Sequence, residues 1–163
     1  MIKFLKSFKY AFCGIVSAIR NERNIRFHIV AAIYALWFSK FYNFTKVEYA
    51  VLFIIIAMVI VSELFNTAIE GTVDLASQSY HEKAQISKDV AAGAVLFSAF
   101  CAVAVGVLLF GDTDVLFEIY NYFRLSLVNS IVFITTIVIS IFFILFLFKP
   151  KKISCMNNNK EKH

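Results

Sequence analysis

The chain has 163 residues, of which 60% are hydrophobic and 17% charged, with a net charge of +5 and a mean hydropathy of +0.75. A soluble domain of this length cannot bury so much apolar surface, so the composition excludes a soluble globular protein. The single Pro and five Gly favour long helices, whose backbone polar groups are satisfied internally. We therefore predict an all-α integral membrane protein.

The first predicted element is an amphipathic helix over residues 1–24. Apolar side chains recur there at helical spacing, and the opposite face carries Lys3, Lys6, Lys9 and Arg20. We expect this helix to lie on the membrane surface. Because the cations flank apolar spans, we expect them to contact anionic lipid headgroups and not nucleic acid.

A three-helix transmembrane core is predicted over residues 25–110. Each expected span is close to the roughly 20 residues that cross the hydrocarbon layer, although His28 and Lys40 interrupt the first. The second continues as a helix through Asp74. The three spans cover residues 27–44, 47–64 and 90–110.

Beyond the core we predict an external loop over residues 111–124, an additional transmembrane helix over 125–148 and a basic cytoplasmic tail over 149–163. The loop is acidic, whereas both chain ends are rich in Lys and Arg. Positive charge favours the cytoplasmic side of a membrane, so we expect four crossings with both termini in the cytoplasm.

Acidic side chains interrupt the end of the second span. Helical spacing places four polar residues on one face, namely Glu63, Asn66, Glu70 and Asp74. Clustered carboxylates at membrane depth need a cation or a hydrogen-bond donor among them. Oxygen ligands favour Mg²⁺, which commonly reaches a protein together with substrate phosphates, so the cluster suggests a nucleotide site.

Two other interpretations use the same acids. They could pair with Lys88, Arg26 or Lys83 as solvated helix ends, or Glu63, Glu70 and Asp74 could relay protons or cations in a transporter. Composition does not separate these alternatives. Glu22 is a further candidate, although taken alone it reads as an acid that offsets neighbouring arginines. No P-loop, dinucleotide-binding or kinase catalytic-loop motif occurs.

The order and spacing of the polar residues also resemble those of a known protein family. Glu63, Asn66-Thr67-Ala68-Ile69-Glu70 and Asp74 are followed by Tyr80-His81-Glu82 and Lys88-Asp89, and are preceded by the block from Glu22 to His28. This arrangement closely resembles the small bacterial diacylglycerol kinase family. The block from Glu22 to His28 is similar to that of the Gram-positive undecaprenol kinase branch.

The resemblance implies a homotrimer in the bacterial plasma membrane, with active sites shared between chains. It implies an ATP- and Mg²⁺-dependent kinase that transfers the γ-phosphate of ATP to a membrane lipid alcohol. We expect undecaprenol as the acceptor, with diacylglycerol, converted to phosphatidic acid, as the alternative. The family's minimal core has three spans, so the span over residues 125–148 is an addition.

The resemblance also implies a role for each matching residue. Glu63 would be the general base that accepts the proton of the lipid hydroxyl, and Glu22 and Glu70 would hold Mg²⁺. The nucleotide would contact Tyr10, Tyr80, His81, Lys88 and Asp89. The acceptor would contact Asn66, Asp74 and Arg26.

Overall fold

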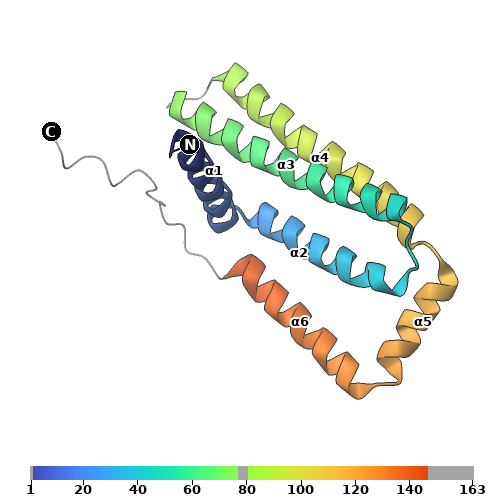
Figure 1. The fold of residues 1–163 in the computed structure, drawn as a ribbon. Helices are drawn as coiled ribbons and strands as arrows, with labels where there is room; N and C mark the ends of the chain where they lie inside the picture. Colours follow the sequence, from blue (N-terminus) through green and yellow to red (C-terminus); the bar gives the residue numbers. More distant parts are fainter. Residues whose placement is uncertain (1, 77–80, 147–163) are drawn as a thin grey trace.

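The computed structural model describes residues 2–76 and 81–146, and all its regular structure there is helical. This confirms the predicted all-α fold (Figure 1). The elements in chain order are α1 (Ile2–Asn21), α2 (Arg23–Phe38), the short 3₁₀ helix η1 (Ser39–Phe41), α3 (Lys46–Ala76), α4 (Glu82–Phe110), α5 (Thr113–Arg124) and α6 (Leu127–Leu145).

Three helices in the described ranges are long and apolar enough to cross a membrane: α3, α4 and α6. They correspond to three of the four predicted spans, including the additional one. The predicted first span over residues 27–44 is not one continuous helix, because α2 ends at Phe38 and η1 follows it. The Ser39 hydroxyl donates to the Leu36 carbonyl oxygen at 2.8 Å, and the chain turns through η1 there. The 16 residues of α2 extend for about 24 Å, less than the roughly 30 Å of hydrocarbon.

The long helices lie side by side in the spatial order α6, α2, α3, α4 (Figure 1). Between α3 and α4, the Ser62 and Ser98 hydroxyls are 2.8 Å apart. Between α2 and α6, the Tyr34 hydroxyl lies 3.2 Å from each of two hydroxyl oxygens, those of Thr136 and Ser140. Such polar contacts join helices in lipid, where apolar surfaces alone give little net attraction.

The segment over residues 111–124, predicted as a loop, contains helix α5. Asp112 begins this helix because its carboxylate accepts from the backbone N–H groups of Asp114 and Val115. The connection between α4 and α6 is therefore partly helical, and its predicted place outside the membrane stays a prediction. Helix α5 joins the C-terminal end of α4 to the N-terminal end of α6. It lies at the opposite end of the bundle from α1 (Figure 1).

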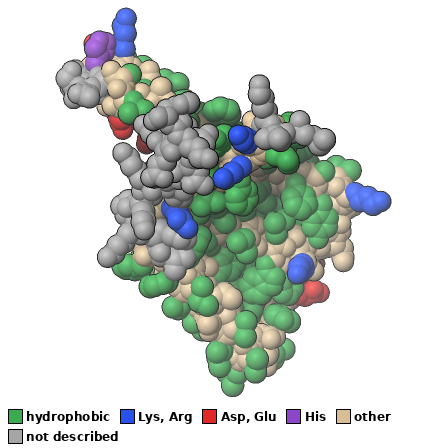
Figure 2. All heavy atoms as spheres, turned by 60° about the vertical axis from the view of Figure 1, so that its left-hand side comes forward, with side chains coloured by type: hydrophobic (Ala, Val, Ile, Leu, Met, Phe, Trp, Pro, Cys, Tyr) green, Lys and Arg blue, Asp and Glu red, His purple; other side chains and the backbone are tan. Residues whose placement is uncertain are grey.

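Apolar side chains cover much of the surface of the long helices. Leu108 on α4 is 84% exposed and Leu127 on α6 is 81% exposed. On the face seen in Figure 2 hydrophobic side chains dominate, and Lys and Arg appear only as isolated groups. Exposure of so large an apolar surface to water is unfavourable, so these helices face lipid or further protein.

Candidate active site

Glu63 is the central polar residue of the bundle. It lies within the apolar helix α3, and only 1% of its surface is exposed. The Asn24 side chain, at the start of α2, donates a hydrogen bond to its carboxylate. The other oxygen, Oε2, has no hydrogen-bond partner among the described residues. A buried carboxylate oxygen without a donor is costly and marks this position as a functional candidate.

The polar face of α3 continues towards the end of the helix. The Asn66 side-chain nitrogen donates to Glu70 Oε1 at 2.8 Å, one turn apart. Asn66 is buried, and its Oδ1 also lacks a partner in the described part of the chain. Asn66 and Glu70 therefore share one face of α3, as predicted, and among the described residues Glu63 Oε2 and Asn66 Oδ1 are acceptors without a partner.

Glu22 lies beside this face because the helical conformation is interrupted at that residue. Between α1 and α2 its backbone is extended, with φ −105° and ψ 122°, and its carboxylate makes no capping bond. A groove of about 500 Å³ lies between α1 and α3, and three acids line it: Glu22, Glu70 and Asp74. Small residues, among them Gly14 and Gly71, leave the space open. The fold therefore brings both predicted Mg²⁺ ligands to one groove.

The ends of α3 and α4 are joined by an ion pair. Lys88 Nζ lies 2.7 Å from Asp74 Oδ1, and their side chains are 31% and 67% exposed. The salt-bridge interpretation therefore holds for Asp74. Beside it, the Gln85 amide donates to Asp89 Oδ1 at 2.8 Å. Lys88 thus stands beside the acidic groove, where a phosphate group would compete with Asp74 for its charge.

The remaining predicted residues are placed differently. His81 is exposed at the start of α4 and makes no capping bond, and Tyr10 is exposed on α1. Tyr80 lies outside the described residues. Arg26, expected to contact the acceptor, is 3% exposed and donates to the carbonyl oxygens of Ile19, Arg20 and Ile144.

The donor set fits a magnesium ion that arrives with phosphates. Within residues 2–76 and 81–146 no group of three or more His, Cys, Asp or Glu side chains is close enough to form a metal cage. Two carboxylates in an open groove, those of Glu22 and Glu70, are instead what Mg²⁺ uses when substrate oxygens and water complete its octahedron.

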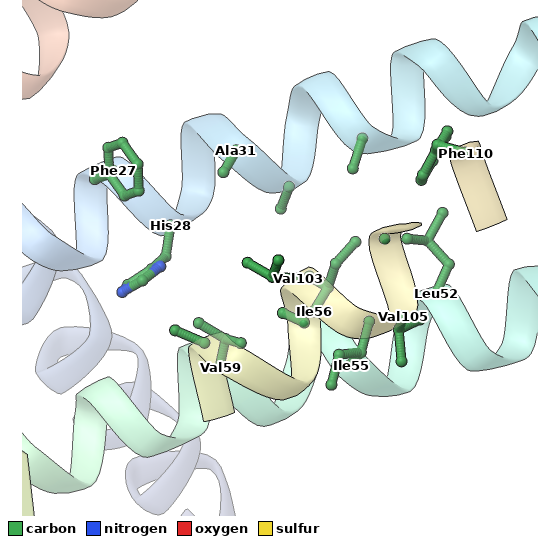
Figure 3. Close-up of a pocket in the computed structure, with 15 residues that line it drawn as sticks. Phe27, His28, Ala31, Leu52, Ile55, Ile56, Val59, Val103, Val105 and Phe110 are labelled. Carbon is green, nitrogen blue, oxygen red and sulfur yellow. The ribbon is translucent and has the colours of Figure 1, made fainter. Parts of the chain in front are cut away.

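An apolar groove of about 280 Å³ lies among α2, α3 and α4 (Figure 3). His28 and Ala31 line it from α2, Ile55 and Val59 from α3, and Val103 from α4. Glu63 follows Val59 by one helical turn. The groove therefore ends within one turn of the buried carboxylate along α3, and its apolar lining suits a lipid chain.

The sequence profile described as "Prokaryotic diacylglycerol kinase" matches residues 9–110. The chain belongs to this family. The match includes α2, α3, α4 and most of α1, and it ends before α5 and α6. Family membership gives the class of enzyme: a kinase whose phosphoryl acceptor is a lipid alcohol.

Relatives carry two different names. A diacylglycerol kinase of Synechocystis is 43% identical over 103 residues, which are 63% of this chain and 59% of that protein. The undecaprenol kinase of Bacillus subtilis is 40% identical over 108 residues, which are 66% of this chain and 88% of that protein. A Haemophilus influenzae diacylglycerol kinase is 31% identical over 109 residues, 92% of its length.

Sequence reasoning did not identify Asn24 as a site residue. It lies in the same polar block as Glu22, and its hydrogen bond to Glu63 joins two helices. A search for the donor that a buried carboxylate requires would have found the amide in that block. The small residues that open the acidic groove were also missed, because their role depends on how α1 crosses α3.

Proposed function

We propose that this protein is an ATP- and Mg²⁺-dependent kinase that phosphorylates undecaprenol in the bacterial plasma membrane. The observation that carries the proposal is the place of the buried Glu63 on α3, one turn after Val59 of the apolar groove and two turns before Glu70 of the acidic groove. The first groove suits a lipid chain and the second suits a magnesium-bound nucleotide. Glu63 would meet the lipid hydroxyl between them.

In the proposed reaction Glu63 accepts the proton of the lipid hydroxyl. The hydroxyl oxygen forms a bond to the γ-phosphorus, the bond from that phosphorus to the β,γ-bridging oxygen breaks, and ADP leaves. Glu22 and Glu70 would hold Mg²⁺, which would neutralise phosphate charge. Lys88 adds a cation beside the same groove. Phosphoryl transfer needs mainly such alignment and charge neutralisation.

The choice of acceptor rests on how the relatives align. The B. subtilis undecaprenol kinase aligns over 88% of its length, whereas the Synechocystis diacylglycerol kinase aligns over 59%. Diacylglycerol is the alternative acceptor. It is supported by the slightly higher sequence identity of the Synechocystis diacylglycerol kinase. The transporter interpretation loses its support, because the acids belong to the matched kinase segment.

We further propose that α2 and the following η1 together cross the membrane beside α3, α4 and α6, so that both chain termini lie in the cytoplasm. The Arg26 contact with Ile144 supports this, because it joins the last turn of α6 to the α1–α2 junction. A homotrimer with shared sites is also proposed. The apolar faces that a single chain leaves uncovered are consistent with it.

The test is to incubate the purified full-length protein with labelled ATP, Mg²⁺ and either undecaprenol or diacylglycerol in detergent micelles. We expect labelled undecaprenyl phosphate, and we expect the Glu63→Gln variant to produce almost none. Glu118→Gln, the same change on the exposed helix α5, is the control. Absence of a labelled lipid with either alcohol would refute the proposal.

A further inference from the structure

We propose that α6 is an intramolecular clasp on the α1–α2 junction and that Arg26 is the positioning residue through which it acts. The family match ends at residue 110, so α6, at Leu127–Leu145, is an addition to the family core. Its effect on catalysis rests on the function proposed above. Its effect on the junction stands on contacts alone.

Arg26 joins the ends of two helices. Its Nη1 donates to the carbonyl oxygens of Ile19, at 3.0 Å, and Arg20, at 2.9 Å, in the last turn of α1. Its Nε donates to the carbonyl oxygen of Ile144, at 3.1 Å, in the last turn of α6. Carbonyl groups in the last turn of a helix lie beyond the regular pattern of intrahelical bonds, and the negative end of the helix dipole favours a cation. The planar guanidinium can serve both ends at once, which a lysine ammonium cannot do with the same geometry.

A second attachment holds α6 against α2. Tyr34 lies within hydrogen-bonding distance of Thr136 and Ser140, which are one turn apart on α6. The Phe133 ring packs edge-on against the Tyr34 ring, with centroids 6.3 Å apart, and also against Trp37, at 5.7 Å. These contacts set the position of α6 along α2 and therefore the position of the Ile144 carbonyl at Arg26.

The junction that Arg26 holds carries two groups of the candidate site. Glu22 is the extended residue between the helices, and its position on the groove depends on the angle between α1 and α2. Asn24, two residues before Arg26, donates to Glu63. If α6 moves along α2, the guanidinium loses a partner and the junction becomes free to change its angle. The acidic groove, which Glu22 lines, then loses its fixed shape.

The test compares a double variant with a single control variant of the full-length chain. Thr136→Val combined with Ser140→Ala removes the two partners of Tyr34 on α6. Thr135→Val is the matched control, because Thr135 is exposed and its hydroxyl donates to the Ile131 carbonyl oxygen of its own helix, at 2.7 Å. Hydrogen–deuterium exchange is measured over residues 17–26, which the substituted side chains do not touch. Kinase kinetics are measured in parallel.

We expect the Thr136→Val/Ser140→Ala variant to exchange about threefold to tenfold faster over residues 17–26, since each lost interhelical bond corresponds to about threefold. We expect its KM for Mg·ATP to rise by a similar factor, with the KM for the lipid unchanged. Arg26→Lys should likewise raise the KM for Mg·ATP and leave the KM for the lipid unchanged. Thr135→Val should match the wild type in every measurement.

Unchanged exchange over residues 17–26 in the double variant would overturn the clasp, whatever the kinase activity. Equal rises in both KM values would also overturn it, because they would indicate general loosening of the fold. A wild-type protein without kinase activity would refute the proposed function instead. The exchange measurement would still decide whether α6 holds the junction.

Discussion

Replacement of Glu63 by Gln should separate stability from activity. Glu63 is 1% exposed, and within residues 2–76 and 81–146 its Oε2 has no hydrogen-bond partner, as is true of Asn66 Oδ1 one turn further along α3. A glutamine of nearly the same shape keeps an acceptor for Asn24, and its new N–H group can donate to Asn66 Oδ1. Relief of unpaired buried acceptors is worth about 1–3 kcal/mol, so we expect the free energy of unfolding to rise by that amount.

The same substitution removes the proposed general base, and we expect kcat to fall by about 10²- to 10⁴-fold. Unfolding is followed by circular dichroism during titration with a denaturing detergent. Phosphorylation of the lipid is measured separately with labelled ATP. Glu118→Gln should change the free energy of unfolding by less than about 0.5 kcal/mol, as expected for a surface position. A Glu63→Gln variant that loses stability, or that keeps most of its activity, would refute this reasoning.

Two further substitutions probe the groups around Glu63. Lys88→Gln should raise the KM for Mg·ATP by about tenfold, since one charge-assisted contact to phosphate is lost. It should barely change the unfolding midpoint, because the ion pair of Lys88 with Asp74 is exposed. Lys83→Gln, also near the start of α4, is the control, and equal effects of the two would contradict a phosphate contact. Asn24→Ala should lower the free energy of unfolding by about 1–3 kcal/mol and lower kcat, because the buried carboxylate then has no donor. Unchanged kcat in that variant would separate Asn24 from the site.

The polar face of α3 could be predicted from the sequence because it depends on one continuous helix. Once α3 is helical from Lys46 to Ala76, the spacing of Glu63, Asn66 and Glu70 fixes their common direction. The same holds for the lengths of α3 and α4, since runs of apolar residues suffice to predict them.

Local side-chain contacts explain where α2 ends and where α5 begins. The bond from Ser39 to Leu36 accompanies the end of α2, within a mainly apolar run. Asp112 begins α5 by a side-chain cap, and an aspartate in that position is a recognisable start signal. The predicted bounds followed hydropathy, which does not register either polar contact.

The partners of Arg26 could not be predicted, because Arg26 and Ile144 are 118 residues apart and the acceptor is a backbone carbonyl. Any residue type at position 144 would supply the same oxygen. The role of Asn24 depends likewise on how α2 lies against α3. These contacts appear only when the helices are assembled.

The central claim is that Glu63 serves phosphorylation of undecaprenol, and a competition experiment tests it most directly. Undecaprenol and diacylglycerol are placed in the same lipid vesicles with the full-length protein, Mg²⁺ and ATP, and both phosphorylated lipids are measured by mass spectrometry. We expect undecaprenyl phosphate to be the main product and to disappear in Glu63→Gln. Phosphatidic acid as the main product would contradict the acceptor assignment, and unchanged product formation in Glu63→Gln would contradict the role of the buried carboxylate.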